Sequence, residues 1–443
     1  MKLSIPEKNI TLYETGFDET DFLNRKPFAD KLSTLIDKFE TPFVVALDGP
    51  WGSGKSFFLK RWVGHHQKSH KDDTIVVYLD AFELDYLDEP MVALVSEIST
   101  RLEIQSSSYK KYLEQGKKFA AKLLLPAARV ATAIATAGTS EVFSAAIGKG
   151  VQAAVSEIDS AATKLWEREH SRREAVTDFR KFLESLTKGV DDLPAKKIVV
   201  VIDELDRCRP DYALSMLEII KHFFDVSDVH FILGVNLAEL ENMARARYGE
   251  KLDARNYIGK FIKVKVEIPE VHPDERIDFG WEIFFDKTAK RMGFDGSFKR
   301  EIKVQLKMLR PGMITLRTIQ RLLTAAAVVP ELTAMNTDSH YRKLFCSLFL
   351  FNFLQGKKVN FNEITLSDIQ DVFNFKYSKD PVNENERSMA HLYSVLAYTL
   401  NAPEFAEISE DDQRVIKNYF DSNRKPDVAL LLRDYVLFAT VKS

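Results

Sequence analysis

The sequence predicts an α/β protein with a mostly parallel sheet, followed by an all-α region. The main observation is a set of short apolar runs, rich in β-branched residues, each followed by a helical pattern. These runs are residues 43–47, 74–81, 197–205 and 230–236. Such runs suit parallel strands buried on both faces, and their alternation with helices is typical of the α/β class. After Pro269 the strand patterns largely vanish and helical spacing takes over.

In chain order, we expect residues 1–40 to form an N-terminal segment that packs on the core. Residues 41–104 and 171–269 are expected to form the α/β core itself. The last core strand, in "FIKVKVEIP" (261–269), alternates apolar and polar residues instead of being uniformly apolar. That alternation favours an edge strand or one with a solvated face.

The core is interrupted by an alanine-rich segment, which we assign to residues 105–170 as a helical insertion. Roughly 150 residues separate Lys55 from Asp203, more than two βαβ units of about 30 residues each would occupy. A membrane span needs about 20 predominantly apolar residues, whereas Lys122, Arg129 and Glu141 interrupt this one. We therefore expect helices that face water or a protein partner, in preference to a membrane hairpin.

Residues 270–443 are expected to form a helical lid and C-terminal domain. Helical spacing is clear in "RIDFGWEIFFDKTAKRM", "SFKREIKVQLKML", "ITLRTIQRLLTAAAVV" and "YRKLFCSLFLFNFLQ". A chain of 443 residues also exceeds what one hydrophobic core usually supports. Two or three domains are therefore expected.

Composition narrows the classes of function. The formal charge of −3 gives no support for a surface that coats nucleic acid, although a local basic stripe remains possible. The two cysteines, Cys208 and Cys346, provide neither a disulfide framework nor a zinc cluster. The first residues lack the apolar stretch of a secretory signal, so we expect a cytoplasmic protein.

Residues 49–56, "GPWGSGKS", follow a buried strand and precede a helix. The pattern comprises Gly49, Pro50, Trp51, Gly52, Ser53, Gly54, Lys55 and Ser56. Glycines let several backbone N–H groups converge on phosphate oxygens, and the helix N-terminus adds partial positive charge. In such a P-loop, Lys55 would reach the β- and γ-phosphates and the Ser56 hydroxyl would bind Mg²⁺. The sequence therefore predicts a P-loop NTPase core, with Trp51 covering the outer side of the loop.

Two adjacent carboxylates end the strand in "VVVIDE" (199–204). Asp203 would hold the metal, and Glu204, where the chain leaves the strand, would orient and deprotonate the attacking water. An Asp-Glu pair predicts an extra strand between the P-loop strand and the Asp203 strand, and "FILGVN" fits it. Asn236 at its end is either a residue that holds the water against the γ-phosphate or an ordinary turn former.

These residues resemble the KAP family of P-loop NTPases, which is related to the AAA-type and STAND ATPases. The resemblance covers about 300 residues. It runs through "DFLNRKPFADKLSTLIDKF", "GPWGSGKSFFLKRW", "VVYLDAFELDYLDEPMVALVSEI", "VVVIDELDRCRP" and "ITLRTIQRLL". The aromatic-acidic stretch and the "DELDRC" run are its most specific parts. The family's Pro-Arg before the lid helix is Leu316-Arg317 here, so the arginine is kept and the proline is not.

The resemblance implies that the protein binds ATP in preference to GTP, together with Mg²⁺. It also implies a homo-oligomer and a setting in a bacterial antiviral defence system, beside a separate effector protein encoded nearby. Family members often carry membrane segments between the two nucleotide motifs. The charged insertion of this chain makes such an attachment an unfavoured reading.

Arginines could complete the site, because phosphoryl transfer gains from a cation at the developing charge. Arg317 is the candidate in the lid helix, and Arg321, one helical turn later, is the alternative. An arginine acting on a neighbouring subunit could be Arg245, Arg247 or Arg255. Arg207 and Arg209 are expected to pair locally with groups such as Asp206 or to build an oligomer contact.

Three functions remain open. The first is an ATPase that uses Mg-ATP binding and hydrolysis as a conformational switch to control assembly or a partner. The second is a nucleotide-gated scaffold with negligible hydrolysis. The third is a nucleic-acid remodelling ATPase, for which "KKYLEQGKKFAAK" could supply basic residues. No cysteine or carboxylate constellation accompanies the histidines His65, His66 and His70, so we expect a solvated helix end there in preference to a metal site.

Overall fold

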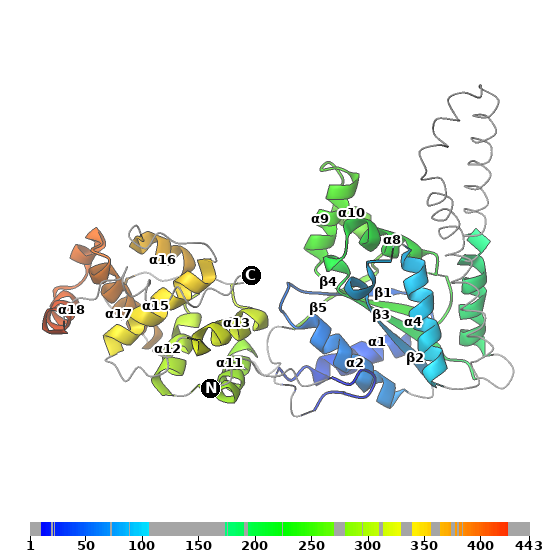
Figure 1. Cartoon of the computed structure of the whole chain (residues 1–443), viewed down its shortest axis with the longest axis horizontal. Coiled ribbons are helices and arrows are strands. Elements are labelled where there is room, and N and C mark those ends of the chain that lie inside the picture. Colours follow the sequence, from blue (N-terminus) through cyan, green and yellow to red (C-terminus); the bar gives the residue numbers. More distant parts are fainter. Residues whose placement is uncertain are drawn as a thin grey trace, which may run out of the picture.

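A computed structural model describes residues 10–18, 21, 23–70, 73–87, 89–105, 173–174, 176–189, 194–223, 225–269, 280–294, 296–309, 313–328, 339–355, 364–373, 377–378, 381–382 and 384–423. It contains a sheet with helices on both faces and, after Pro269, an all-helical region (Figure 1). The α/β class, the P-loop NTPase core and the helical second half are confirmed. The predicted insertion at 105–170 lies almost wholly outside the described residues.

Five parallel strands form the sheet in the order β2-β3-β4-β1-β5. Their bounds are β1 Val44–Asp48, β2 Thr74–Asp80, β3 Lys197–Asp203, β4 Val229–Val235 and β5 Val264–Glu267. The strand β4 therefore lies between the P-loop strand β1 and the Asp203 strand β3, as the Asp-Glu pair predicts. In register, Asp48 lies opposite Val235 and Asp203 lies opposite Gly234. The carboxyl ends of the three strands thus meet at one edge of the sheet.

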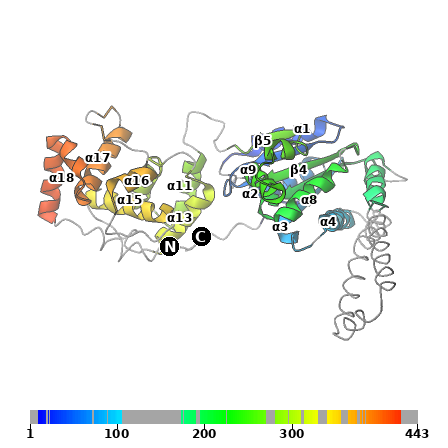
Figure 2. The same ribbon diagram turned by 90° about the horizontal axis from the view of Figure 1, so that it is seen from above.

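Alternate residues of each strand enter two different cores. Val44 and Ala46 of β1 belong to one core, and Val45 and Leu47 to the other. The first core is covered by α4 (Pro90–Gln105), α8 (Pro210–Lys221), α9 (Leu237–Tyr248), α10 (Ala254–Gly259) and a helical stretch at 176–188. The second is covered by α1 (Lys26–Lys38) and α2 (Lys55–Ser69). Figure 2 shows the sheet between these helical layers.

The two outer strands of the sheet differ in how they are closed. In β2, the outward N–H of Tyr78 donates to the hydroxyl of Tyr13 at 3.0 Å. The outward carbonyl of Val76 accepts from Nε of Arg101 at 3.0 Å. The strand β5 is short and alternates in burial, as expected for an edge, and its Lys265 pairs with Asp48 and Glu267.

The second half forms a separate helical core. Its α-helices are α11 Gly280–Met292, α12 Gly296–Leu306, α13 Leu316–Ala327, α15 Ser339–Gln355, α16 Leu366–Val372, α17 Glu384–Thr399 and α18 Glu410–Asn423. The described residues also include three short helices, which are α3 Ala81–Leu84 and η2 Leu205–Arg207 in the first half and η3 Pro403–Glu407 in the second. Among all the described helices, none is long and apolar enough to cross a membrane.

Candidate nucleotide site

The loop between β1 and α2 has the backbone that a phosphate cradle requires. Gly52 and Gly54 have φ values of 85° and 86°, and Gly54 is the N-cap of α2. Residues other than glycine rarely adopt that left-handed backbone conformation. The glycine spacing of the motif therefore has a direct conformational cause, and it delivers the chain into α2 with Lys55 as the first helical residue.

Lys55 is buried at the centre of this loop. Its Nζ donates to the carbonyl oxygens of Gly49 at 2.5 Å and Pro50 at 3.2 Å. Burial lowers the pKa of Lys55, and the charges of Asp206, Asp203 and Asp48 partly offset that effect. The ammonium is thus held over the loop by weak acceptors, which phosphate oxygens would replace with stronger, charge-assisted ones.

The hydroxyl of Ser53 gives an independent sign that the loop fits a polar ligand. Its Oγ is buried and has no hydrogen-bond partner in the part of the chain that the structure describes. Buried polar atoms usually have a partner, and a missing one needs an explanation. A phosphate in the cradle would supply such a partner.

Asp203 ends β3 beside the loop and is 0% exposed. The hydroxyl of Tyr78 donates to its Oδ2 at 2.8 Å, and the N–H of Glu204 donates to its Oδ1 at 2.9 Å. Burial raises the pKa of Asp203 to about 6, although the hydroxyls of Tyr78 and Ser56 lower it in part. A buried carboxyl near a serine hydroxyl is a donor set that suits Mg²⁺, which prefers oxygen ligands. Asp203 and Ser56 are therefore the residues that would hold the ion.

Glu204 has an unusual backbone and two side-chain partners. Its φ is 58°, in the left-handed region, where a residue other than glycine is uncommon. The strained turn directs the carboxylate toward the P-loop helix, where Oε1 accepts from the hydroxyl of Ser56 at 3.2 Å. Its Oε2 forms an ion pair with Nη1 of Arg207 at 2.5 Å. The expected local pairing of Arg207 is thus present, and its partner is the proposed base.

Asn236 directly follows β4 and is the N-cap of α9, but its side chain forms no cap hydrogen bond. The carbonyl of Val235, just before it, accepts the N–H of Gly49 at 3.2 Å. The structure therefore places Asn236 next to the first residue of the loop. A turn-forming role through the side chain has no support from its cap geometry.

Arg317 comes to the loop from the helical half of the chain. Its N–H donates to the carbonyl of Gly52 at 3.4 Å, and a Cβ added at Gly52 would lie 2.8 Å from Cβ of Arg317. Within the described residues its guanidinium forms no hydrogen bond or ion pair. Arg321 does not line the pocket described next.

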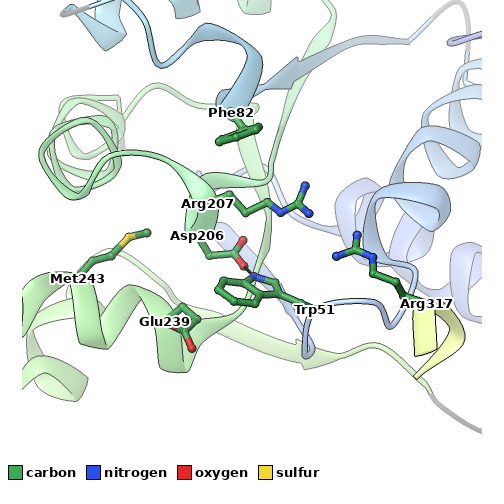
Figure 3. Close-up of a pocket in the computed structure, with 7 residues that line it drawn as sticks. All are labelled: Trp51, Phe82, Asp206, Arg207, Glu239, Met243 and Arg317. Atoms are coloured by element: carbon green, nitrogen blue, oxygen red, sulfur yellow. Dashed lines mark hydrogen bonds between the residues drawn. The ribbon is translucent and has the colours of Figure 1, made fainter. Parts of the chain in front are cut away.

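A pocket of about 470 Å³ opens beside the loop. It is lined by Trp51, Phe82, Asp206, Arg207, Glu239, Met243 and Arg317. Figure 3 shows the guanidinium groups of Arg207 and Arg317 pointing into the same space. Arg207 is paired with Glu204, and Asp206 and Glu239 line the same pocket, so Arg317 is the cation best placed there to meet negative charge.

The three arginines considered for a neighbouring subunit lie in different environments. Arg245 pairs with Glu241 at 3.2 Å, and Arg247 pairs with Asp211. Arg255 is exposed on α10. Arg209 differs from Arg207, because its N–H and guanidinium donate to Asp85, which is distant from it in the sequence.

Several contributing residues could not be assigned from the sequence. Asp206 is buried and accepts a 2.6 Å hydrogen bond from Nε1 of Trp51, so Trp51 anchors the loop to the segment that follows β3. Burial raises the pKa of Asp206, while Trp51 and Lys55 lower it. Arg25 donates to the carbonyls of Ser53 at 3.0 Å and Pro269 at 3.1 Å. The only sequence signal for these two was their position inside "NRKPFAD" and "DELDRC".

A P-loop at the end of β1, an acidic pair at the end of β3 and a strand between them define a P-loop NTPase domain. The model of the KAP family P-loop domain matches residues 25–332, which is more than half of the chain. The chain therefore belongs to the KAP family of P-loop proteins, as the sequence motifs predict, and nucleotide binding is the activity common to this fold.

Solved structures show a more distant likeness. The Aeropyrum pernix ORC2 protein in its ADPNP–ADP complexes is 11% identical, with a TM-score of 0.37, and the alignment covers 93% of this chain and 88% of that one. The ADP form of the same protein is 12% identical, with a TM-score of 0.35, and the alignment covers 94% of this chain and 98% of that one. A DNA replication initiation factor is 11% identical, with a TM-score of 0.30, and the alignment covers 95% of this chain and 99% of that one. No curated protein matches the chain.

Proposed function

We propose that the protein is a KAP-type ATPase that uses Mg-ATP binding and hydrolysis as a conformational switch. The observation that carries the proposal is the contact between the lid helix α13 and the phosphate loop, through Arg317 and Gly52. Because the loop and the lid helix touch, a phosphate that fills the loop would alter the position of α13. The helical half would then report the nucleotide state to a partner.

Hydrolysis is assigned to residues of this chain in distinct roles. Lys55 would bind the β- and γ-phosphates, and Ser56 and Asp203 would hold Mg²⁺, which neutralises phosphate charge when bound. Glu204 would take the proton of the attacking water, and the amide of Asn236 would orient that water. Arg317 would meet the charge that develops on the transferred phosphoryl group.

In the described structure, both carboxylate oxygens of Glu204 already accept a hydrogen bond, one from Ser56 and one from Arg207. Each oxygen keeps a second lone pair, but the two contacts fix the direction of the carboxylate. We therefore expect Glu204 to reach an attacking water more readily when one of them opens. This observation also favours the second candidate, a nucleotide-gated scaffold with negligible hydrolysis, in which Glu204 would stay paired.

The setting of the switch follows from the family. We propose that the protein forms a homo-oligomer in the cytoplasm, that it controls a separate effector protein, and that the two act in bacterial antiviral defence. Support for the oligomer is the position of Arg255, which is exposed on α10 where a neighbouring subunit could reach it. The effector and the defence setting rest on the family resemblance alone.

The deciding experiment compares Glu204→Gln with Asp203→Asn. The first should retain Mg-ATP binding and lower turnover by about 10²-fold or more, the usual contribution of a positioned base. The second should weaken metal-dependent binding, because an amide is a poor magnesium ligand. Phosphate release and fluorescent-nucleotide titration measure the two effects. Equal turnover by the Gln variant would remove Glu204 from the mechanism, and a wild type that binds but never hydrolyses ATP would favour the scaffold.

A further inference from the structure

The far end of the P-loop helix, away from the phosphate site, brings together two imidazoles and a carboxylate. His66 and His70 are four residues apart and therefore share one face of α2. Their rings stack with centroids 4.3 Å apart. Asp37, in the last turn of α1, lies against His70, with its Oδ2 3.0 Å from Nε2. One coordinating atom from each of the three residues lies within 4.8 Å of the others.

This arrangement contradicts the expectation of a solvated helix end without a carboxylate. His66 is 0% exposed, and Asp37 comes from a different helix that packs on α2. The sequence could not reveal the cluster, because the carboxylate approaches only through the docking of α1 on α2. The docking is apolar: Leu32 and Ile36 of α1 share a core with Trp62 of α2.

His66 carries the observation that points to a ligand. Its ring stacks on Trp62 at 4.8 Å, and its Nδ1 lies 2.9 Å from the Oγ of Ser33. Its other nitrogen, Nε2, is buried and has no hydrogen-bond partner within the described ranges. Leaving a buried nitrogen unpaired is unfavourable, because the group has lost its hydrogen bond to water without gaining another. His66 therefore brings a buried imidazole with an unpaired nitrogen to a cluster that also holds a second imidazole and a carboxylate.

The surroundings of His66 agree with that reading. Its ring lies between Trp62 and His70, and the contact of its Nδ1 with Ser33 fixes the orientation of the ring, as outer hydrogen bonds commonly do for histidine ligands.

We propose that His66, His70 and Asp37 form a site for a divalent transition-metal ion of the Zn²⁺ type. Two imidazoles and one carboxylate select such metals over Mg²⁺ or Ca²⁺, which prefer oxygen ligands. The ammonium of Lys197, which donates to the carbonyl of Asp37 at 2.8 Å, opposes a cation, and the Asp37 carboxylate counters it. Water would complete a three-residue zinc site.

Binding requires His70 to turn out of its stack on His66, because an imidazole nitrogen binds a metal in the plane of its ring, and requires the contact of its Nε2 with Asp37 to open. Zn–N bonds of about 2.0–2.1 Å place two nitrogens roughly 3.3 Å apart in a tetrahedral site. His66 is fixed in the core, whereas the side chains of His70 and Asp37 are 26% and 38% exposed. The two partly exposed ligands can therefore move toward the buried one. The bound ion would fasten α1 to the end of the P-loop helix.

The test uses the full-length protein, freed of metal by a chelator and then dialysed. Zn²⁺ is titrated in competition with a chromophoric chelator, and Co²⁺ is added separately for its visible absorption. One equivalent of Zn²⁺ should bind, and Co²⁺ should give the absorption of a low-coordinate nitrogen–oxygen site. His70→Ala and Asp37→Asn, at partly exposed positions, should each weaken Zn²⁺ binding by about 100-fold or more, at least as much as the loss of an outer hydrogen bond.

The matched control is His65→Ala. His65 lies on the same helix but bonds to Asp30 at 2.7 Å, outside the cluster, so its loss should change Zn²⁺ affinity by less than about twofold. Circular dichroism checks that each variant is folded. Absence of Zn²⁺ binding by the wild type would overturn the proposal. So would equal affinities for the wild type and the His70 and Asp37 variants, or a loss in the His65 variant as large as theirs.

Discussion

Removing the guanidinium of Arg207 should raise the basal ATPase rate. Arg207 holds Oε2 of Glu204 at 2.5 Å and so fixes the direction of the carboxylate that would accept a proton from the attacking water. The two side chains are 31% and 19% exposed, so solvent screens the pair in part. A charge-assisted hydrogen bond contributes about 1.5–3 kcal/mol when dry and exposed pairs at most about 1 kcal/mol, so about 1 kcal/mol is reasonable here.

An interaction of about 1 kcal/mol corresponds to a factor of about 5 at room temperature. We therefore expect Arg207→Ala to hydrolyse ATP about 5-fold faster than the wild type at saturating Mg-ATP, with little change in ATP affinity. Steady-state phosphate release without any partner is the assay. Arg209→Ala is the matched control, because Arg209 bonds to Asp85 and not to Glu204.

The double variant Arg207→Ala with Glu204→Gln tests whether Arg207 acts on turnover through its contact with Glu204 or in another way. If Arg207 acts by restraining Glu204, the double variant should be as slow as Glu204→Gln alone. A tenfold or larger fall in turnover for Arg207→Ala, with ATP binding intact, would refute the reasoning and show that the guanidinium assists the reaction. A rate indistinguishable from that of the Arg209 control would show that the pair imposes no restraint.

Two further predictions test the loop and the core. Gly52→Ala should weaken ATP binding by about tenfold or more, because the added Cβ strains the left-handed backbone and lies 2.8 Å from Cβ of Arg317. The control in a nucleotide titration is Gly259→Ala, where an added Cβ meets nothing within 4 Å. Equal ATP affinities for the Gly52 variant and the wild type would contradict the lid contact. Burial, and then a nearby lysine, lower the pKa of His230 to about 4, so stability present above pH 6.5 should be lost as the pH falls toward 4, by about 2 kcal/mol at pH 5. Urea unfolding should show that His230→Leu loses about 2 kcal/mol less than the wild type between pH 6.5 and pH 5, whereas the exposed-site variant His222→Ala loses as much as the wild type. Equal losses in His230→Leu and the wild type would rule out that origin.

Much of the fold could be predicted because its signals are local. Buried parallel strands are apolar on both faces, so β1, β3 and β4 can be predicted from runs of β-branched residues. The placement of β4 between β1 and β3 was predicted from chemistry, since Asp203 and Glu204 occur together in the class with that strand order. The alternating pattern of β5 likewise predicted its place at an edge of the sheet.

The remaining features depend on contacts between distant segments. The pairing of Trp51 with Asp206 and the docking of Asp37 on His70 arise only once helices and strands have packed. No spacing rule connects such residues, because their separation in the chain bears no relation to their distance in the fold. Arg207 and its partner Glu204 are only three residues apart in the sequence, yet their ion pair forms because the backbone turns into the left-handed region at Glu204.

The closure of the outer strands limits how copies of this protein can join. A free strand edge is a template on which another chain can add its own strand, often irreversibly. At β2, Tyr13 accepts a hydrogen bond from the outward N–H of Tyr78, and Arg101 donates one to the outward carbonyl of Val76. At the other edge, β5 has only four residues and carries the charged Lys265, which disfavours pairing with a further strand. Extension of the sheet from one molecule to the next is therefore disfavoured at both margins. Self-association would rely on side-chain surfaces instead, which can separate again when the contacts that hold them change.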